Sequence, residues 1–330
     1  MKAIKFFAIS AMAAAMITSC SSEDELSQSN YPSDNIIRVT AGVNNAKTRA
    51  EGAGTEMKKD FSLTIVNKNA PKYTYTDKVF SKTSGDWACS ETLLWQKSDA
   101  LVDIVAFAPA QTGKFNGVYA NGSIQPIAYS VASDQSTEQS TSSANNDLLY
   151  YYAKDFNPGE SLDKGKLNIQ FNHAFCMIDI NVTLGTEFNK PSIPTTSPII
   201  KVTLGGTKIA ANVNVTNTAS VVTASGEATA TDITTTNGSF TTAANAETNA
   251  ISRFSCIAIP QTVGANTFKV SLMTAGKLYE WTSDKEITLQ SGYRYTLELS
   301  MGNDVVLLKG GSISATPWTE ITSDKPLETD

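Results

Sequence analysis

The chain has 330 residues, of which 41% are hydrophobic and only 18% are charged, and its formal net charge is −6. This length predicts about two domains of ~150 residues each, and the apolar fraction excludes a wholly disordered chain. The acidic balance lacks the basic footprint of a nucleic-acid-binding protein. A single histidine, His173, and four widely spaced cysteines exclude multi-histidine metal sites and zinc ribbons, so neither an enzyme nor a cofactor is predicted.

The amino terminus has the pattern of a signal peptide, which we predict for residues 1–19. A basic start precedes an apolar stretch at residues 6–17, which is too short to span ~30 Å of hydrocarbon comfortably. The stretch ends in a motif that resembles a bacterial lipobox, so Cys20 is the predicted lipidation site; an ordinary secretory signal is the alternative. Residues 20–35 begin with an acidic run and form the predicted lipidated tether, either an export tag for the outer surface or a simple spacer.

Beyond the tether, apolar and polar residues alternate with a period of two, which predicts β-strands. Ile37, Val39 and Val43 would share one face of the first strand, within residues 36–49. A denser apolar run at residues 101–107 predicts a more deeply buried strand.

The apolar face of residues 166–184 shifts phase at Asn172-His173. One extra residue turns every later side chain to the other face, so a bulge or a bend is predicted there. His173 is then expected to be a hydrogen-bonded structural residue rather than a catalyst. Further strands are predicted at 199–204, 209–215, 254–259, 268–273, 278–281, 293–299, 305–308 and 312–318.

Many short strands between Gly, Pro and Asn turns are typical of an all-β sandwich. Three prolines in residues 185–198 interrupt the strand pattern and predict a boundary between two tandem sandwiches, 36–185 and 186–330. Residues 216–248 are rich in Ser and Thr and fit either a loop or weak edge strands.

Candidate chemical groups are few. Carboxylate pairs such as Asp99 and Asp103 are predicted to be solvated, and no phosphate-binding loop motif occurs. Cys176 and Cys256 lie in apolar strands and are expected to be buried thiols, whereas the state of Cys89 is left open. The run of three tyrosines at residues 150–152 would suit either core packing or stacking on sugar rings.

A protease site is predicted after the first strand, because residues 47–54 are small, polar and glycine-containing. Cleavage after Arg49 would make Ala50 the new amino terminus and would detach both the lipid anchor and the first strand. The loss of a strand exposes an apolar groove and unpaired backbone groups, which form a template for strand addition from another molecule. An uncut loop is the alternative.

Several short motifs follow one another in an order and spacing that cover about residues 36–320. They are the lipobox at Cys20, Thr48-Arg49-Ala50, Leu94-Trp95, Val105-Ala106-Phe107-Ala108-Pro109, Asp147-Leu148-Leu149-Tyr150, Phe171-Asn172-His173-Ala174, Ile259-Pro260-Gln261-Thr262-Val263, Ser291-Gly292-Tyr293-Arg294-Tyr295 and Pro317-Trp318-Thr319. In this set of motifs, the chain resembles the fimbrillin family of anaerobic Gram-negative gut and oral bacteria.

The resemblance implies two transthyretin-like β-sandwich domains and a pilus subunit that travels to the cell surface as an outer-membrane lipoprotein. An Arg-specific protease would cut after Arg49, and a donor strand from the carboxy-terminal region of a neighbouring subunit would fill the groove. Residues 319–330 contain few apolar side chains, so the identity of the donor strand, and a stalk or tip position, stay open. Two other interpretations remain: an uncut lipidated anchor or accessory subunit, and a surface glycan-binding lipoprotein. A host or bacterial surface ligand is a further expected partner, beside other fimbrial subunits and the protease.

Overall fold

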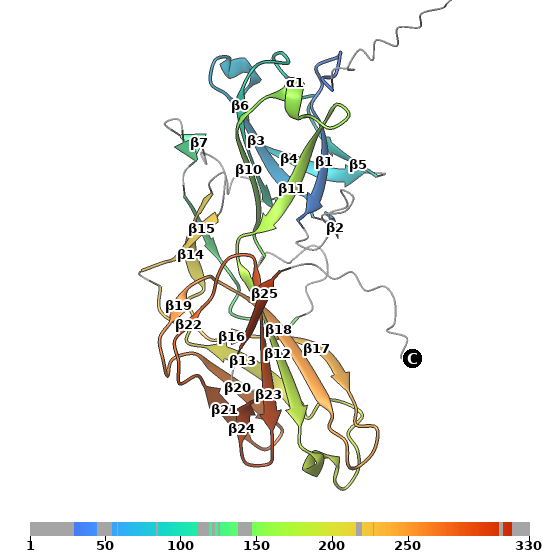
Figure 1. The fold of residues 1–330 in the computed structure, drawn as a ribbon, viewed down its shortest axis with the longest axis vertical. Coiled ribbons are helices and arrows are strands. Elements are labelled where there is room, and N and C mark those ends of the chain that lie inside the picture. Colours follow the sequence, from blue (N-terminus) through green and yellow to red (C-terminus); the bar gives the residue numbers. More distant parts are fainter. Residues whose placement is uncertain are drawn as a thin grey trace, which may run out of the picture.

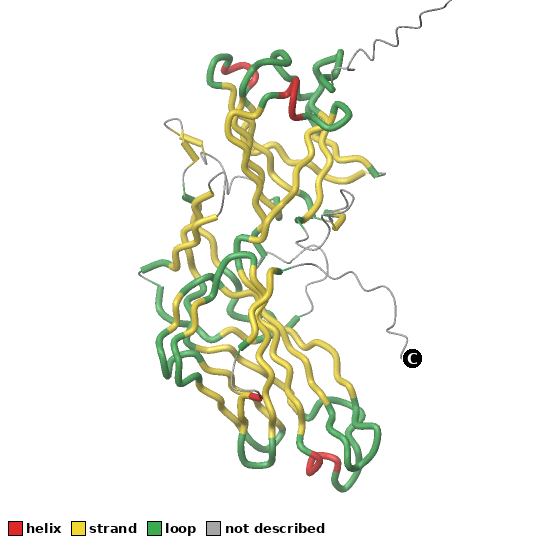
Figure 2. The backbone as a smooth tube through the Cα atoms, viewed as in Figure 1, coloured by secondary structure: helices red, strands yellow, loops and turns green. Residues whose placement is uncertain are grey.

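The computed structural model describes residues 30–44, 55–57, 59–83, 85–110, 119–120, 123–124, 126–137, 147–215, 220–226, 228–309 and 313–318. The predicted lipidation and cleavage residues, Cys20, Arg49 and Ala50, lie outside these ranges. Figure 1 shows an elongated molecule, with most strands of the amino-terminal half in its upper part and those of the carboxy-terminal half below. The chain is all-β, as the alternating pattern predicts (Figure 2).

Eight strands of the amino-terminal half form one sheet, in the order β11-β10-β6-β3-β4-β5-β1-β2. A further pairing of β1 with β11 closes this sheet into a ring from which only β2 branches. In Figure 1, β1 and β11 lie in front of β3 and β4, so the ring has two layers here. The bounds are β1 Arg38–Val43, β2 Thr55–Glu56, β3 Phe61–Asn67, β4 Tyr75–Thr83, β5 Asp86–Cys89, β6 Val102–Ala108, β10 Leu149–Phe156 and β11 Lys166–His173.

The carboxy-terminal half contains two larger sheets that face each other. The six-stranded sheet has the order β17-β18-β12-β23-β24, with β25 also paired to β23, and the four-stranded sheet has the order β16-β13-β20-β21. The bounds are β12 Cys176–Leu184, β13 Ile199–Gly205, β16 Ile233–Thr234, β17 Thr236–Thr241, β18 Ile251–Ala258, β20 Lys269–Thr274, β21 Leu278–Thr282, β23 Tyr293–Met301, β24 Val306–Leu308 and β25 Ser314–Pro317.

Smaller elements complete the fold. A three-stranded sheet joins β9 (Ile127–Ser130), β14 (Ala210–Val215) and β15 (Ser220–Ala224), and two short ladders pair β7 (Tyr119–Ala120) with β8 (Ser123–Ile124) and β19 (Thr262–Val263) with β22 (Ile287–Thr288). The helical turns are η1 Pro71–Tyr73, α1 Pro158–Ser161 and η2 Thr186–Asn189. Across the described ranges, no helix combines the length and the apolar character that a membrane crossing requires.

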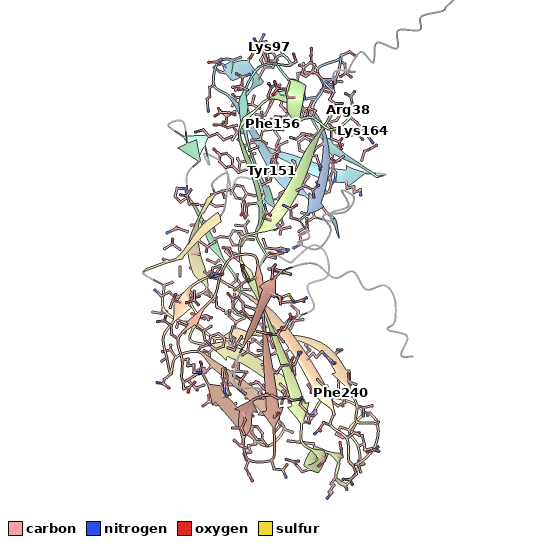
Figure 3. The ribbon with its side chains drawn as sticks, viewed as in Figure 1. Arg38, Lys97, Tyr151, Phe156, Lys164 and Phe240 are labelled. Atoms are coloured by element: carbon pink, nitrogen blue, oxygen red, sulfur yellow. The ribbon has the colours of Figure 1, made fainter. Side chains whose placement is uncertain are left out.

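The apolar side chains gather in two clusters. The upper cluster lies within the eight-stranded ring, and the lower cluster lies among the carboxy-terminal sheets and includes some side chains from residues 105–150. Phe61 stands at the centre of the upper cluster, with its ring 5.4 Å from that of Phe171 on β11 and 4.9 Å from that of Trp87 on β5. Since β3 and β11 are not neighbours in the sheet, the contact of Phe61 with Phe171 crosses the space between the two layers. Figure 3 shows Tyr151 and Phe156 on β10, both of which pack against this cluster.

Strand β6 belongs to both clusters and is buried along its whole length, as the dense apolar run predicts. Ile104 and Ala106 face the upper cluster, whereas Val105 and Phe107 face the lower one. Successive side chains of a strand point to opposite faces, so a strand between two cores carries no polar alternation.

The phase shift at Asn172-His173 marks the passage of the chain from one sheet to another. Strand β11 ends at His173 in the eight-stranded sheet, and β12 begins at Cys176 in the six-stranded sheet, between β18 and β23. The predicted bend is therefore confirmed. Residues 176–184, which the predicted division at 185/186 assigns to the first domain, pair only with strands of the carboxy-terminal half. The division into two domains stays a prediction, and strand pairing favours placing it at residues 174–175.

The Ser- and Thr-rich residues 216–248 supply strands at sheet edges, one of the two alternatives that the sequence left open. Strands β15, β16 and β17 each stand at the end of their sheet. Cys176 and Cys256 are buried free thiols, as predicted, and Cys89 is free and half-buried. Burial raises the pKa of both buried thiols far above the usual range, which makes them unreactive.

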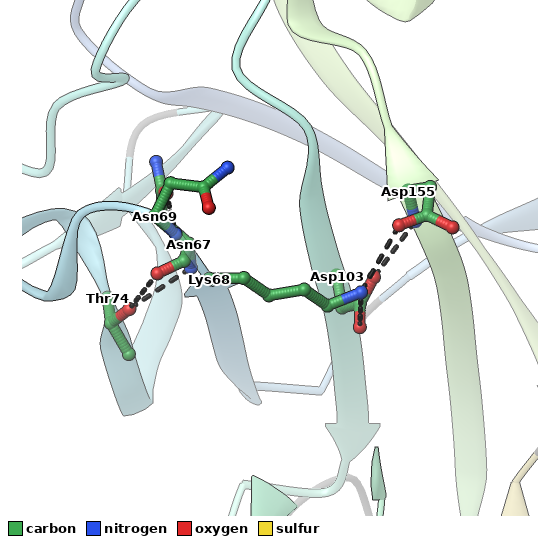
Figure 4. Close-up of polar contacts among 6 residues, drawn as sticks. All are labelled: Asn67, Lys68, Asn69, Thr74, Asp103 and Asp155. Atoms are coloured by element: carbon green, nitrogen blue, oxygen red, sulfur yellow. Dashed lines mark hydrogen bonds and ion pairs between the residues drawn. The ribbon is translucent and has the colours of Figure 1, made fainter. Parts of the chain in front are cut away.

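Asp103 on β6 does not follow the prediction of a solvated carboxylate, because its side chain is only 3% exposed. The Nζ atom of Lys68 lies 2.9 Å from Asp103 Oδ2 and 3.2 Å from Asp155 Oδ1, as Figure 4 shows. The backbone N–H of Asp155 donates to Asp103 Oδ1 over 2.9 Å, at an irregularity in the pairing of β10 with β6. The buried charge is thus satisfied by an ion pair and a backbone donor. By contrast, Asp99 is exposed, as predicted.

Candidate functional site

Strand β1 fills the gap between two strands that would otherwise be sheet edges. It runs parallel to β11, from Arg38 opposite Lys166 to Val43 opposite Phe171, and meets β5 on its other side. Backbone hydrogen bonds continue the pairing beyond both ends, from the N–H of Ile37 to the carbonyl of Leu93 (2.9 Å) and from the N–H of Asn44 to the carbonyl of Phe171 (2.7 Å). The strand therefore closes the ring of the upper sheet.

One face of β1 is buried in the upper cluster, as the sequence predicts. Ile37, Val39 and Val43 are only 6%, 4% and 2% exposed, whereas the intervening Arg38 and Thr40 face solvent. Burial of an aliphatic side chain of this size stabilises a fold by roughly 1.5–3 kcal/mol. The three side chains thus bind β1 to the rest of the sheet more strongly than its exposed polar contacts do.

The groove beneath β1 has aromatic walls. Val39 lies opposite Trp87 on β5, Val43 lies opposite Phe171 on β11, and the rings of both aromatic residues contact Phe61. Removal of β1 would uncover this apolar surface together with the free backbone edge of β11. An extended chain with alternating apolar residues would match both features, since backbone pairing supplies affinity and the groove selects side chains.

The two ends of β1 carry different polar contacts. At the start, Arg38 forms an exposed ion pair with Asp34. Hydrogen bonds from Arg38 and from the N–H of Ile36 lower the pKa of Asp34 to about 2, although exposed pairs of this kind add little stability. At the other end, the side-chain amide of Asn44 donates to Asn172 Oδ1 over 2.8 Å. The chain leaves the described range after Asn44, close to the passage between the two halves.

Asn172 is followed by the buried His173, which has the structural role that the sequence predicts. Its Nδ1 atom lies 3.0 and 3.1 Å from the two carboxylate oxygens of Asp147, and the indole ring of Trp318 stacks on its imidazole with centroids 3.7 Å apart. Burial raises the pKa of Asp147, but the charge and hydrogen bond of His173 outweigh it and hold this pKa below the ordinary 3.8. The sequence did not predict this cluster, because 26 and 145 residues separate its members and neither Asp147 nor Trp318 has a spacing that points to His173.

Acid should weaken the contact between Asp147 and His173. Because the pKa of Asp147 is lowered in the folded state, its stabilising contribution is present above about pH 4 and is lost as the pH falls below that value. At pH 7, Asp147→Asn should lower the free energy of unfolding by about 1.5–3 kcal/mol, as expected for a hydrogen bond to a charged group.

Urea unfolding at pH 7 and pH 2.5 measures this effect. The difference between the native chain and Asp147→Asn should shrink at the lower pH. Asp99→Asn, which changes an exposed carboxylate, is the control and should have little effect. An equal difference at both pH values would contradict the expected titration.

The carboxy-terminal segment lies on the outer edge of β23. Strand β25 pairs with residues 293–296 and β24 with residues 299–301 of that strand. Val306 is buried and Leu308 packs against the lower cluster, but all four side chains of β25 are exposed.

The three tyrosines of β10 do not form one exposed platform. Tyr150 is buried and belongs to the lower cluster, together with the partly buried Tyr152, whereas Tyr151 points to the upper cluster. Burial raises the pKa of Tyr151. Core packing, rather than sugar stacking, is the role that these contacts support. Among the described residues, no group of three or more His, Cys, Asp or Glu side chains is placed to hold a metal ion.

The same fold occurs in several solved structures, each with low sequence identity to this chain. A proposed cell adhesion protein from Bacteroides ovatus superposes with a TM-score of 0.60 at 17% identity, over 87% of this chain and 98% of that one. A second, from Bacteroides uniformis, gives 0.54 at 14% identity, over 87% and 100%. A fimbrial protein from Bacteroides vulgatus gives 0.52 at 16% identity, over 86% and 99%.

No curated protein matches the sequence. The sequence model of one family does match, over residues 48–318, from the segment that follows β1 to the tryptophan that stacks on His173. This range includes all the later strands of both halves. Together with the shared fold, the match confirms the resemblance given by the sequence motifs: the chain belongs to the fimbrillin-like family.

Proposed function

We propose that the chain is a structural subunit of a cell-surface fimbria that is exported as a lipoprotein, cut after Arg49 and polymerised by donor-strand exchange. The observation that carries the proposal is the position of β1, which closes a sheet between β11 and β5 and covers an apolar groove with three side chains. A strand held in this way can be replaced by an equivalent strand from another subunit. The polymer would serve adhesion to a host or bacterial surface.

Membership of the fimbrillin-like family makes the chain a structural protein rather than an enzyme. Its partners in the proposal are other fimbrial subunits, an Arg-specific protease and, before processing, the outer membrane through lipidated Cys20. The match to the family model begins at residue 48, beside Arg49, and so leaves β1 outside. That limit agrees with a first strand that is not part of the final subunit.

The donor in this proposal is the carboxy-terminal segment of the next subunit. Strands β24 and β25 both lie on the outer edge of β23 and can leave without breaking another ladder. Val306 and Leu308 supply large apolar side chains that pack in the lower cluster, whereas all four side chains of β25 are small or polar and exposed. We therefore expect β24 to enter the apolar part of the groove.

The mature amino terminus tests the proposal most directly. Mass spectrometry of fimbriae sheared from cells should find Ala50 at the amino terminus, and Arg49→Ala should prevent polymer formation, whereas Lys47→Ala should not. If surface material carries only lipidated Cys20, the polymerising role is contradicted and a permanently anchored accessory subunit is favoured instead.

A further inference from the structure

Residues 313–318, the last described part of the carboxy-terminal segment, are held on their own chain by side chains at their two ends: Ile313 is partly buried against the lower cluster, and Trp318 is buried. Strand β25 pairs with β23 from Ser314 opposite Thr296 to Pro317 opposite Tyr293, but its own side chains bury no apolar surface. Trp318 is only 8% exposed, and its backbone N–H donates to the carbonyl of Gly292 over 2.7 Å. Its indole ring is therefore the main apolar anchor of β25.

The anchor rests on the amino-terminal half of the molecule. The Trp318 ring stacks on the imidazole of His173 at an interplanar angle of 13°, and His173 is the last residue of β11. The hydrogen bond to Asp147 fixes the orientation of this ring from one side. His173 Nε2 is buried and has no hydrogen-bond partner among the described residues, and the Trp318 ring covers one face of the imidazole.

Strand β1 ends at Val43, opposite Phe171, and the next residue, Asn44, contacts Asn172, which immediately precedes this histidine. Asn44 bonds to the carbonyl of Phe171 through its backbone and to Asn172 through its side chain. On its other edge, β11 pairs with β10 only through Leu149 opposite His173 and Tyr150 opposite Asn172. The end of β11 is thus held between Asn44 and β10. The departure of β1 would leave one edge of β11 unpaired as far as Phe171, two residues before His173, and would remove the side-chain bond to Asn172.

We infer that the stack of Trp318 on His173 is a latch that keeps the carboxy-terminal segment on its own chain, and that the departure of β1 loosens it. This inference rests on the proposed function. It orders the steps of assembly, because a subunit would release its donor segment only after its own acceptor groove has opened. Unprocessed subunits would therefore hold both their groove and their donor strand closed.

Hydrogen exchange on the full uncut chain tests the latch. Trp318→Ala should raise the exchange rates of amides in the β23–β25 ladder at least tenfold, while amides in the β12–β18 ladder keep their rates. Trp318→Phe, which retains an aromatic ring, should restore most of the protection. Thr316→Ala, an exposed change in β25, is the control and should leave the ladder as it is. Unchanged exchange in Trp318→Ala would overturn the latch.

The coupling to β1 needs a second comparison. The full chain is cut with an Arg-specific protease, mass spectrometry verifies that cleavage occurs at Arg49 alone, and the β1 fragment is removed. Dilution keeps the cut chain monomeric. Its β23–β25 ladder should exchange as fast as that of Trp318→Ala, and uncut Asn172→Ala should lie between. Full protection in the cut monomer would refute the coupling even if fimbriae begin at Ala50. Conversely, a terminus at Cys20 in cells would refute the proposed function without changing this result.

Discussion

A chain that begins at Ala50 is expected to lose most of the stability of its amino-terminal half and to regain it when a peptide of residues 36–44 is added. The change removes Ile37, Val39 and Val43 from the upper cluster and leaves β11 without a partner from Lys166 to Phe171. At roughly 1.5–3 kcal/mol per buried side chain, the apolar loss alone is about 5–9 kcal/mol. That amount is comparable with the ~5–15 kcal/mol that stabilises a typical domain.

Urea unfolding followed by tryptophan fluorescence measures this loss, because Trp87 and Trp95 both report on the upper cluster. The shortened chain should unfold at a much lower urea concentration and should also form oligomers as its concentration rises. The same peptide with Val39→Asp is the control and should restore nothing. An unfolding midpoint equal to that of the full chain would show that β1 is dispensable and that no groove opens.

A single charge placed on the buried face of β1 should have the second largest effect. Val39→Asp puts a carboxylate on the buried face of β1, against the aromatic wall formed by Trp87 and Phe61. The loss of the valine contacts and the desolvation of the charge together should cost about 3–5 kcal/mol. Thr40→Asp changes the next, exposed position in the same strand and should cost under about 0.5 kcal/mol.

Hydrogen exchange separates local release of β1 from general unfolding. In Val39→Asp, the amides of β11 that face β1 should exchange faster, while the β12–β18 ladder in the lower half stays protected. Easier cleavage after Arg49 should accompany the change. If Thr40→Asp and Val39→Asp behave alike, the buried face of β1 does not hold the strand.

The strands could be predicted from sequence because each core face needs an apolar residue at every second position. Ile37, Val39 and Val43 were assigned to one buried face on that ground alone. The same pattern cannot tell which strands pair, so it gives no sign that residues 176–184 pair with strands of the carboxy-terminal half. Proline-rich residues 185–198 interrupt the pattern more visibly than the phase shift at Asn172-His173, which predicts a bulge or a bend but gives no sign that the chain changes sheet.

The polar contacts could not be predicted from the sequence, for a different reason. Asp103 was expected in solvent because an isolated aspartate is normally exposed, and only the fold brings Lys68 and the backbone of Asp155 to it. The stack of Trp318 on His173 likewise joins residues from opposite ends of the chain. Contacts of this kind depend on tertiary arrangement and leave no periodic signal.

The parallel pairing of β1 with β11 bears on how the molecule resists force. A pull along the axis of β1 would load the hydrogen bonds from Arg38 to Val43 together, in shear, and they would have to break almost at once. A pull perpendicular to the strand would instead break them one after another. A donor strand that took this position would inherit the shear geometry, so stretching a fibre along the strand would load the joint between its subunits in shear as well.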